Sequence, residues 1–390
     1  MSDLPRSADV VVIGAGVLGL AAGYFLRKDG ASVVVLDKGM AGWEASGRAT
    51  GFLSLRGEQP LEVPLAAAAE RLWATLDDEL GTLTEWRPGG RLWVAIEPES
   101  WAELAQTCPL WRQAGVAVEL VDAAAARKIA PCLGENTIGG MHTARGGHAN
   151  PQRTTQAFAW AFQRIGGILA EFTPATDIAI AGGRIAAVQT VSGAIATSAV
   201  VACAGPQLGH IGRMVGVEIP VAPVRLEAMV TVPLPPLFEV AMVGNGLSLR
   251  QTRRGNIHFN GGPHEWIDVS LCAEPAKPNT PIIRNMTRRL AELFPSLAGV
   301  NALRSWAGVI EVTPDATVIL DRPGAPEGFV VCSASGHGFG LAPAIGQALA
   351  DLVVRGRSSI AIDGLGLDRF VGLPRDWRAA RSWHAGSYNT

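Results

Sequence analysis

The first strong pattern in the chain is a short apolar run that leads into closely spaced glycines. Val10 to Ile13 is continuously apolar, Gly14, Gly16 and Gly19 follow, and a stretch with helical spacing then reaches a second apolar run, 33–36. This order predicts a strand, a tight turn, a helix and a second strand, which together form the first βαβ unit of a dinucleotide-binding fold.

The glycines and the acid that closes the second run fit this interpretation. Gly14 lets the chain turn sharply, Gly16 lets backbone approach a pyrophosphate, and Gly19 lets the helix pack close to the strand. Asp37 follows Gly14 by about 20 residues, the separation at which a carboxylate meets the ribose hydroxyls of a dinucleotide. The alternative is a glycine-rich turn in a ligand-free α/β domain, and the complete strand, helix and acid context weighs against it.

The apolar pattern predicts further helices and strands beyond this unit. Helical spacing predicts helices over 63–83, 101–114, 152–165, 281–293 and 344–354. Apolar runs predict strands over 90–96, 178–180, 184–190, 195–202, 225–232, 318–320 and 329–333, and a hairpin over 246–262. The segments after about residue 61 are therefore expected to begin a second domain.

A second glycine-rich junction lies late in the chain, where the strand predicted over 329–333 runs into Ser335-Gly-His-Gly-Phe-Gly340. Backbone amides at the following helix start offer partial positive charge to an anion or an electron-rich ring. A nicotinamide enzyme has no need of such a junction, whereas a reduced flavin carries negative charge that these amides would stabilise. An ordinary turn into a helix is the alternative.

Composition narrows the class of protein. A chain of 390 residues suits about two domains, and a net charge of −2 gives no general drive toward nucleic acid or anionic membrane. The cysteines are scattered and form no Cys-x-x-Cys pair, so we expect reduced thiols and no metal site; they are Cys108, Cys132, Cys203, Cys272 and Cys332. The short polar start and the absence of a long apolar run predict a cytoplasmic protein without a membrane span.

Seven motifs, taken in order, resemble one family. They are Gly14 to Gly19 with Asp37, then 46–51, 147–151, 201–206, 249–252, 306–315 and 335–343. The chain resembles the FAD-dependent D-amino-acid oxidase superfamily, in the branch of glycine oxidase, sarcosine oxidase β subunits, hydrogen cyanide synthase, opine oxidases and D-hydroxyproline dehydrogenases. Each motif alone is weak, but their order and spacing are specific.

The resemblance implies an α/β plus α+β fold, in which a mixed-sheet substrate domain is inserted into a Rossmann-like FAD-binding domain. The FAD domain would comprise 1–60, 141–220 and 315–372, and the substrate domain 61–140 and 221–314. Residues 373–390 would form a C-terminal tail, which is compatible with docking to another protein.

The resemblance also assigns residues to non-covalent FAD. Residues at the ADP half and the ring would be Gly14, Gly16, Val17, Leu18, Gly19, Asp37, Lys38, Ser46, Gly47, Arg48, Ala49, Thr50 and Gly51. Ala175 would meet the adenine through its backbone, Ala204 and Gly205 would close over the ribityl chain, and Gly336, His337, Gly338, Phe339, Gly340 and Leu341 would meet the pyrimidine end of the ring. No counterpart of a flavin-linking histidine or cysteine is recognisable.

The expected substrate clamp is absent. Glycine-oxidase-like members carry an arginine for the substrate carboxylate where this chain has Ile310, followed by Glu311. Losing a guanidinium removes a charge-assisted pair, so a simple glycine-type substrate is disfavoured. The remaining candidates for the carboxylate are Arg250, then Arg48 and Arg225; for each, a solvated surface arginine is the alternative.

Three further residues could act at the ring or the substrate. Glu311 could steer a substrate cation or simply be a surface carboxylate. His337 could donate a hydrogen bond to flavin or substrate, or contribute only backbone to its turn. Trp306 could wall the pocket, although packing in the core is favoured slightly.

The family reaction is oxidation of a carbon–nitrogen bond beside a carboxylate, with hydride transfer to the flavin and hydrolysis of the imine. We expect an amino-acid-like substrate: an N-substituted amino acid, opine, imino acid or D-amino acid. The branch with Glu311 often works as a β subunit beside a second flavin and iron–sulfur subunits, so a partner protein could accept the electrons. The alternatives are a stand-alone oxidase that makes hydrogen peroxide and a non-catalytic FAD-binding subunit.

Overall fold

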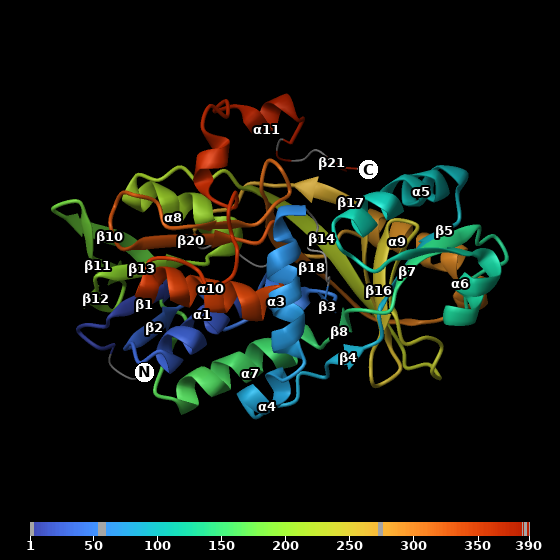
Figure 1. The fold of residues 1–390 in the computed structure, drawn as a ribbon, viewed down its shortest axis with the longest axis horizontal. Coiled ribbons are helices and arrows are strands. Elements are labelled where there is room, and N and C mark those ends of the chain that lie inside the picture. The colour runs from blue at the N-terminus through green and yellow to red at the C-terminus, as the bar shows by residue number, and fades with distance from the viewer. Residues whose placement is uncertain (1–3, 54–59, 272–275, 384, 386–387, 390) are drawn as a thin grey trace.

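Two large β-sheets organise the molecule and lie side by side (Figure 1). The computed structural model describes residues 4–53, 60–271, 276–383, 385 and 388–389. Among these, no helix is long and apolar enough to cross a membrane. Cys272, counted above among the thiols, lies outside the described residues, as do parts of the C-terminal tail.

The first sheet has six strands in the order β19-β20-β13-β1-β2-β9. Its strands are β1 (Val10–Ile13), β2 (Val33–Leu36), β9 (Ile168–Ala170), β13 (Ala199–Ala202), β19 (Ile319–Asp321) and β20 (Phe329–Ser333). All neighbours are parallel except β19 and β20. A parallel sheet needs cover on both faces, which explains why β1 and β2 are apolar at every position and fully buried.

Helices cover one face of this sheet and a small β-meander covers the other. The helices are α1 (Val17–Lys28), α3 (Val63–Trp73), α4 (Leu76–Leu80), α7 (Pro151–Arg164) and α10 (Ala342–Arg355). On the opposite face lie β10 (Ala175–Ala181), β11 (Arg184–Thr190), β12 (Gly193–Ala196) and α8 (Leu208–Val215). Along β1, Val10 and Val12 join the helical core, whereas Val11 and Ile13 join the other one.

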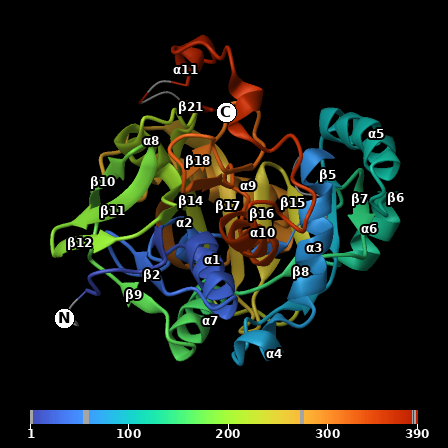
Figure 2. The ribbon, with the colours of Figure 1, turned by 60° about the vertical axis from the view of Figure 1, so that its left-hand side comes forward.

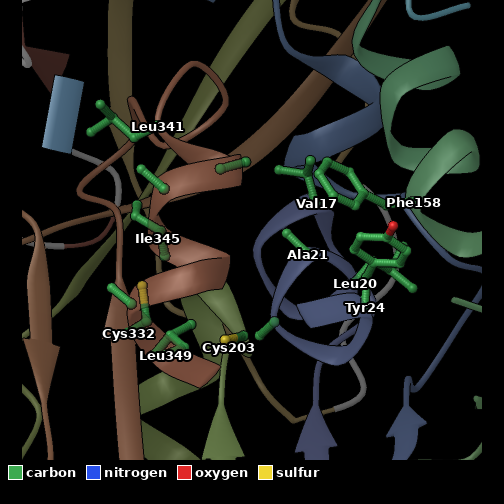
Figure 3. Close-up of a cluster of buried hydrophobic side chains, with 14 of the residues drawn as sticks. Val17, Leu20, Ala21, Tyr24, Phe158, Cys203, Cys332, Leu341, Ile345 and Leu349 are labelled. Carbon is green, nitrogen blue, oxygen red and sulfur yellow. The ribbon is translucent and has the colours of Figure 1, made fainter. Parts of the chain in front are cut away.

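The helical core is centred on α1, which packs between α10 and α7 (Figure 3). Ala21 of α1 meets Gly346 of α10, and a Cβ at Gly346 would lie 2.6 Å from the Ala21 Cβ. Small residues therefore let the two helices approach closely at the point where α1 leaves the glycine turn. This contact fixes the direction of α1 toward the region between the sheets.

The second sheet has nine strands and is mixed. Its main path is β18 (Ala302–Val312), β14 (Ala222–Thr231), β17 (Ile257–Trp266), β16 (Leu247–Gln251), β15 (Ala241–Gly244), β5 (Arg91–Ala95), β7 (Gly139–Thr143) and β6 (Glu119–Asp122). One face packs on a core with α6 (Ala123–Ile129) and α9 (Thr280–Leu293), while α5 (Pro98–Gln113) lies against β5 and β7. At β5 and β7 the opposite face is covered by α5, where Trp93 and Met141 pack with Cys108 and Trp111.

A small three-stranded sheet and the C-terminal segment complete the arrangement (Figure 2). The small sheet is β3 (Phe52–Leu53), β8 (Gly147–His148) and β4 (Arg87–Pro88). The C-terminal segment contains α11 (Trp377–Ala380) and β21 (Tyr388–Asn389), which pairs with β17. Trp383 stacks on Trp266 with ring centroids 4.2 Å apart, so this segment packs on its own chain.

Two expected elements are wrong in extent. The helix expected over 63–83 is broken into α3 and α4, and Ala74 and Thr75 separate them. The strand expected over 195–202 is two strands in different sheets, because β12 ends at Ala196 and β13 begins at Ala199. The apolar pattern continues across both breaks because the residues on either side are buried in the same core: Trp73 and Leu76 in one, Ile195 and Val200 in the other.

Candidate active site

One cavity runs from the glycine turn after β1 to the exposed face of the second sheet. Its volume is about 310 Å³. The first sheet and its loops contribute Gly14, Gly16, Val17, Leu18, Asp37, Lys38, Ser46, Arg48, Ala49, Thr50, Gly51, Ala204, Gly205, Gly336, His337, Gly338 and Phe339. These predicted positions, which are distant in sequence, therefore line a single space.

The turn between β1 and α1 has room only for glycine. Gly14 has φ +108°, and a Cβ there would lie 2.4 Å from the carbonyl oxygen of Cys203. A Cβ on Gly19 would lie 1.9 Å from the carbonyl oxygen of Gly14. Gly16, the N-cap residue of α1, has no side chain to cap the helix. Apart from the Val17 amide, which donates to Ser46, the first helical turn can present backbone amides to a ligand.

Two side chains hold this turn in place. Asp37 accepts hydrogen bonds from the Ala15 amide at 2.7 Å and the Gly39 amide at 2.8 Å. Ser46 Oγ accepts from the Val17 amide at 2.9 Å. Burial raises the pKa of Asp37, and the two backbone donors oppose that rise. Asp37 thus supports the turn as well as lining the cavity.

Five residues assigned to FAD do not line this cavity: Gly19, Gly47, Ala175, Gly340 and Leu341. Gly19 packs against Gly14, and Gly47 against Gly42. Ala175 is buried at the start of β10, and Leu341 in the helical core. The Gly340 carbonyl accepts a hydrogen bond from Trp73 Nε1 at 2.8 Å. Contact of these residues with FAD stays a prediction.

The late glycine junction presents His337 to the cavity. Its Nδ1 lies 3.0 Å from the Ser335 carbonyl oxygen, and its Nε2 lies 2.9 Å from Glu62 Oε1. Glu62 Oε1 also accepts from the Val318 amide at 2.7 Å. His337 thus links the junction to Glu62, the residue before α3.

Glu311 is a buried carboxylate in the cavity wall, not a surface residue. Its Oε1 accepts from Ser333 Oγ at 3.2 Å and from the Ala334 amide at 3.1 Å. Burial raises the pKa of Glu311, and these donors counteract the rise. Its neighbour Ile310 packs against Gly336, where a Cβ would lie 2.5 Å from Ile310 Cδ1.

The three arginines considered for the carboxylate lie in different surroundings. Arg48 lines the cavity and donates to the Trp43 carbonyl at 2.8 Å and to the Ala307 carbonyl. Arg250 is buried behind the lining and donates to the Thr50 carbonyl, and burial lowers its pKa to about 10. Arg225 forms ion pairs with Glu227 and Glu265 and does not line the cavity.

Trp306 does not line the cavity either. Its Nε1 donates to the Arg48 carbonyl at 3.2 Å, and its ring lies 5.0 Å from that of His258. Burial, together with Arg250, holds the pKa of His258 well below its ordinary value. Trp306 thus packs behind the loop that carries Arg48.

Arg91 and Asn260 line the cavity and were not anticipated, and neither was Glu62, which contacts His337 but is not part of the lining. Asn260 Oδ1 is buried without a hydrogen-bond partner among the residues that the structure describes. Arg91 is the charged first residue of an otherwise apolar strand, and this pattern could have marked it as a candidate. Glu62 and Asn260 gave no such signal, because their roles depend on contacts that are distant in sequence.

The lining fits FAD by its shape and its polarity. Gly16 gives α1 no side-chain cap, and Asp37, Ala204 and Gly205 belong to the same lining. The junction at Gly336 and Gly338 is equally tight, since a Cβ on Gly338 would lie 2.2 Å from the Ala334 Cβ. In the described ranges, no group of three or more His, Cys, Asp or Glu residues could hold a metal ion.

Comparison with known proteins decides the family. The DAO family model, described as FAD dependent oxidoreductase, matches residues 9–352. The chain belongs to this family. The β subunit of sarcosine oxidase from Rhodobacter capsulatus is 26% identical over 371 residues, covering 93% of this chain and 88% of that one. Glycine oxidase from Geobacillus kaustophilus is 29% identical over 380 residues, covering 93% and 97%.

The fold comparison agrees. L-proline dehydrogenase from P. horikoshii has the same fold, with a TM-score of 0.85 at 24% identity and coverage of 97% of this chain and 99% of that one. The predicted fold class and the predicted resemblance to FAD-dependent amino-acid oxidases and dehydrogenases are thus confirmed. The division into domains, the individual site residues and non-covalent attachment stay predictions.

Proposed function

We propose that this DAO-family enzyme oxidises the C–N bond of an amino-acid-like amine. The observation that carries the proposal is the single cavity that joins the glycine turn, the His337 junction and the face of the second sheet. FAD, when bound, supplies the hydride acceptor. A substrate bound at the sheet side of that cavity would therefore lie next to the cofactor.

The residues around the junction suit a hydride acceptor. The start of α10, which has no side-chain cap, brings partial positive charge toward the end of the cavity where Gly336 and Gly338 lie. Such charge stabilises the negative charge that develops on a reduced ring. The side chains act by position and charge, and none has to form a bond to substrate.

Residues on the face of the second sheet would position the substrate. The polar lining there includes Ser248, Asn260 and Glu311, and Asn260 Oδ1 is a buried acceptor for an N–H group. The α-carbon loses hydride, the nitrogen lone pair forms the imine, and water then releases the amine and a carbonyl product. This chemistry needs an aligned neutral amine more than a general base. We infer an N-substituted amino acid, opine, imino acid or D-amino acid as substrate.

Non-covalent FAD is part of the proposal. Two thiols, Cys203 and Cys332, lie against the cavity. Burial raises the pKa of Cys203 to about 12 and also raises that of Cys332, so both remain protonated and poorly nucleophilic. Acid precipitation should leave all the FAD absorbance in the supernatant; absorbance that stays with the pellet would contradict this part.

Anaerobic reduction tests the reaction itself. Purified enzyme loaded with FAD is mixed without oxygen with sarcosine, proline derivatives, opines and D-amino acids, and loss of the oxidised flavin absorbance is followed. We expect at least one of them to bleach the flavin. If none does, the enzyme proposal fails and the protein is a non-catalytic FAD-binding subunit.

The electron acceptor is a separate question. Similarity to a sarcosine oxidase β subunit supports transfer to a partner protein, and similarity to glycine oxidase supports use of oxygen. We favour the dehydrogenase or β-subunit role. With the amine that bleaches the flavin best, the isolated chain should reoxidise slowly in air; rapid oxygen uptake with hydrogen peroxide would instead establish an oxidase.

A further inference from the structure

The lining of the cavity changes from polar to apolar across the second sheet. Ser248 of β16 pairs with Asn260 of β17, Asn260 pairs with Ala228 of β14, and all three line the cavity. Two residues along β14, Leu226 pairs with Gly308 of β18, and both also line the cavity. Because paired residues and alternate residues of a sheet share a face, these side chains face the same space.

Four apolar residues lie together on the β14–β18 side of this face, and we call them the apolar strip: Leu226, Ala228, Gly308 and Ile310. Ala228 is buried, whereas Leu226, Gly308 and Ile310 are half-buried and belong to the cavity lining. Apolar surface that lines a cavity is stabilised when an apolar group covers it and removes it from water. The strip therefore favours an apolar part of a ligand.

A tryptophan cluster that includes the C-terminal segment supports the strip. Leu226 and Ile310 pack against a core that contains Trp266 and Trp377, and Trp383 stacks on Trp266. The strip is thus the edge of an apolar core that continues beyond the cavity. Its side chains are held in place by this packing, so the strip is a fixed part of the cavity wall.

The groups around the strip disfavour a second carboxylate. Ile310 stands where the family resemblance leads one to expect an arginine. Within β14 and β18, all of whose residues the structure describes, the only ionisable residues in the lining are acidic, Glu227 and Glu311. Arg48 presents methylene groups to the strip, since a Cβ on Gly308 would lie 3.4 Å from Arg48 Cβ, and its guanidinium donates to two backbone carbonyls. A negatively charged substituent on the strip would therefore lie near Glu311 without a cation from either strand.

We propose that the substrate carries an apolar substituent that lies on the apolar strip, while its amine faces Ser248 and Asn260. The inference rests on the proposed function and narrows its substrate class. Amines with an aliphatic or aromatic group are favoured, and opines whose second carboxylate would lie on the strip are excluded. The substituent is attached to the α-carbon or to the nitrogen, and the experiment below distinguishes the two.

Matched pairs of amines test the substituent at nearly constant shape. Leucine is paired with aspartate, each in the D and the L form, for a substituent on the α-carbon, and N-isobutylglycine is paired with iminodiacetate for a substituent on the nitrogen. Within each pair a carboxymethyl group replaces an isobutyl group, and half-saturation concentrations for anaerobic flavin reduction are measured.

In at least one pair the isobutyl member should have a half-saturation concentration about 100-fold lower, because a buried charge without a partner is strongly disfavoured. The pair that shows this difference identifies the atom that carries the substituent. Equal values within every pair that reduces the flavin, or a lower value for the carboxymethyl member, would overturn the inference.

The variant Leu226→Asn tests the strip, because it keeps the shape of the side chain but makes it polar. The half-saturation concentration for the isobutyl member should rise about 10-fold, since each buried methylene group contributes roughly fourfold, and the value for the carboxymethyl member should not rise. Leu303→Asn is the matched control, because Leu303 lies on β18 but is 63% exposed and outside the lining; it should change neither value. An unchanged ratio in Leu226→Asn would contradict the role of the strip. If Leu226→Asn does not retain FAD, Ile310→Thr is used for the same comparison.

A binding measurement separates this inference from the proposed function. If none of the pairs reduces the flavin, the enzyme loaded with FAD is titrated with 4-methylpentanoate and with succinate, which are leucine and aspartate without the amine, and the flavin absorption spectrum is followed. Perturbation by 4-methylpentanoate alone, weakened in Leu226→Asn, would support the apolar strip although the reaction proposal had failed. Equal perturbation by the two acids, or none by 4-methylpentanoate, would refute it.

Discussion

At the α1 end of the cavity the lining comes from several loops of the first sheet and is rich in glycine and other small residues, whereas at the sheet end it consists of larger side chains from several strands. The first end is rigid, because a Cβ at Gly14 or Gly338 would overlap neighbouring atoms. The second end keeps a buried polar atom, Asn260 Oδ1, without a protein partner among the described residues. Backbone geometry thus defines the cofactor, and side-chain chemistry defines the substrate.

The largest effect is expected at the glycine turn. Gly19→Ala would place a Cβ 1.9 Å from the Gly14 carbonyl oxygen, so the turn must open. We expect a loss of about 3 kcal/mol or more in the free energy of unfolding, together with loss of FAD. Gly299→Ala is the matched control, since a Cβ there meets nothing within 4 Å. Denaturant unfolding checks both; similar stabilities would show that the turn is not rigid.

The variant Asp37→Ala tests whether a side chain contributes to FAD binding at the α1 end of the cavity. Asp37→Ala removes the acceptor for the Ala15 and Gly39 amides and the carboxylate expected at the ribose. We expect FAD affinity to fall by about 1.5 to 3 kcal/mol, the range for hydrogen bonds to a charged group. Titration of the apoprotein with FAD measures this. An unchanged dissociation constant would reject the ribose role.

His148 lies in β8 of the small sheet, outside the cavity lining, and provides a pH test. Burial lowers the pKa of His148 to about 3, so the unfolded chain binds a proton below about pH 6.5 that the folded chain does not. Stability is therefore lost as the pH falls, by about 2 kcal/mol between pH 6.5 and 5. His148→Gln should lose less stability than the parent over that range in denaturant unfolding. Parallel pH profiles would contradict a neutral buried His148.

The smallest effect is expected at the sheet end. Asn260→Ala removes a buried acceptor that faces the cavity, so the half-saturation concentration for the amine should rise by about 1 kcal/mol, or roughly fivefold. FAD affinity should stay the same. A change in FAD affinity without a change in substrate dependence would place Asn260 at the cofactor and weaken the distinction between the two ends.

The same contrast explains what could be predicted from the sequence. The first βαβ unit depends on contacts within about 30 residues, so Gly14, Gly16, Gly19 and Asp37 were informative as a local motif. The break between β12 and β13 was missed, because Ile195 and Val200 are both buried but in different sheets. Burial pattern alone does not reveal which sheet a strand joins.

Residues at the sheet end of the cavity were harder to predict from the sequence, because their placement depends on which strands pair. Arg250 and Arg225 are arginines within predicted strands, and the structure places the first behind the cavity lining and the second in ion pairs. Arg91 carries a similar local pattern but lines the cavity. The pairing of β5 with β15 and β7 determines this placement, and that pairing joins residues about 50 to 150 positions apart. Local spacing holds no information about it.

The alternation of side chains along the nine-stranded sheet has an evolutionary consequence. Leu92 and Leu249 stabilise the core, whereas their chain neighbours Arg91 and Ser248 line the cavity. The positions that keep the protein folded and those that line the cavity are therefore adjacent in sequence but distinct. The shape and charge of the cavity can change by single replacements at alternate positions, with little penalty in folding.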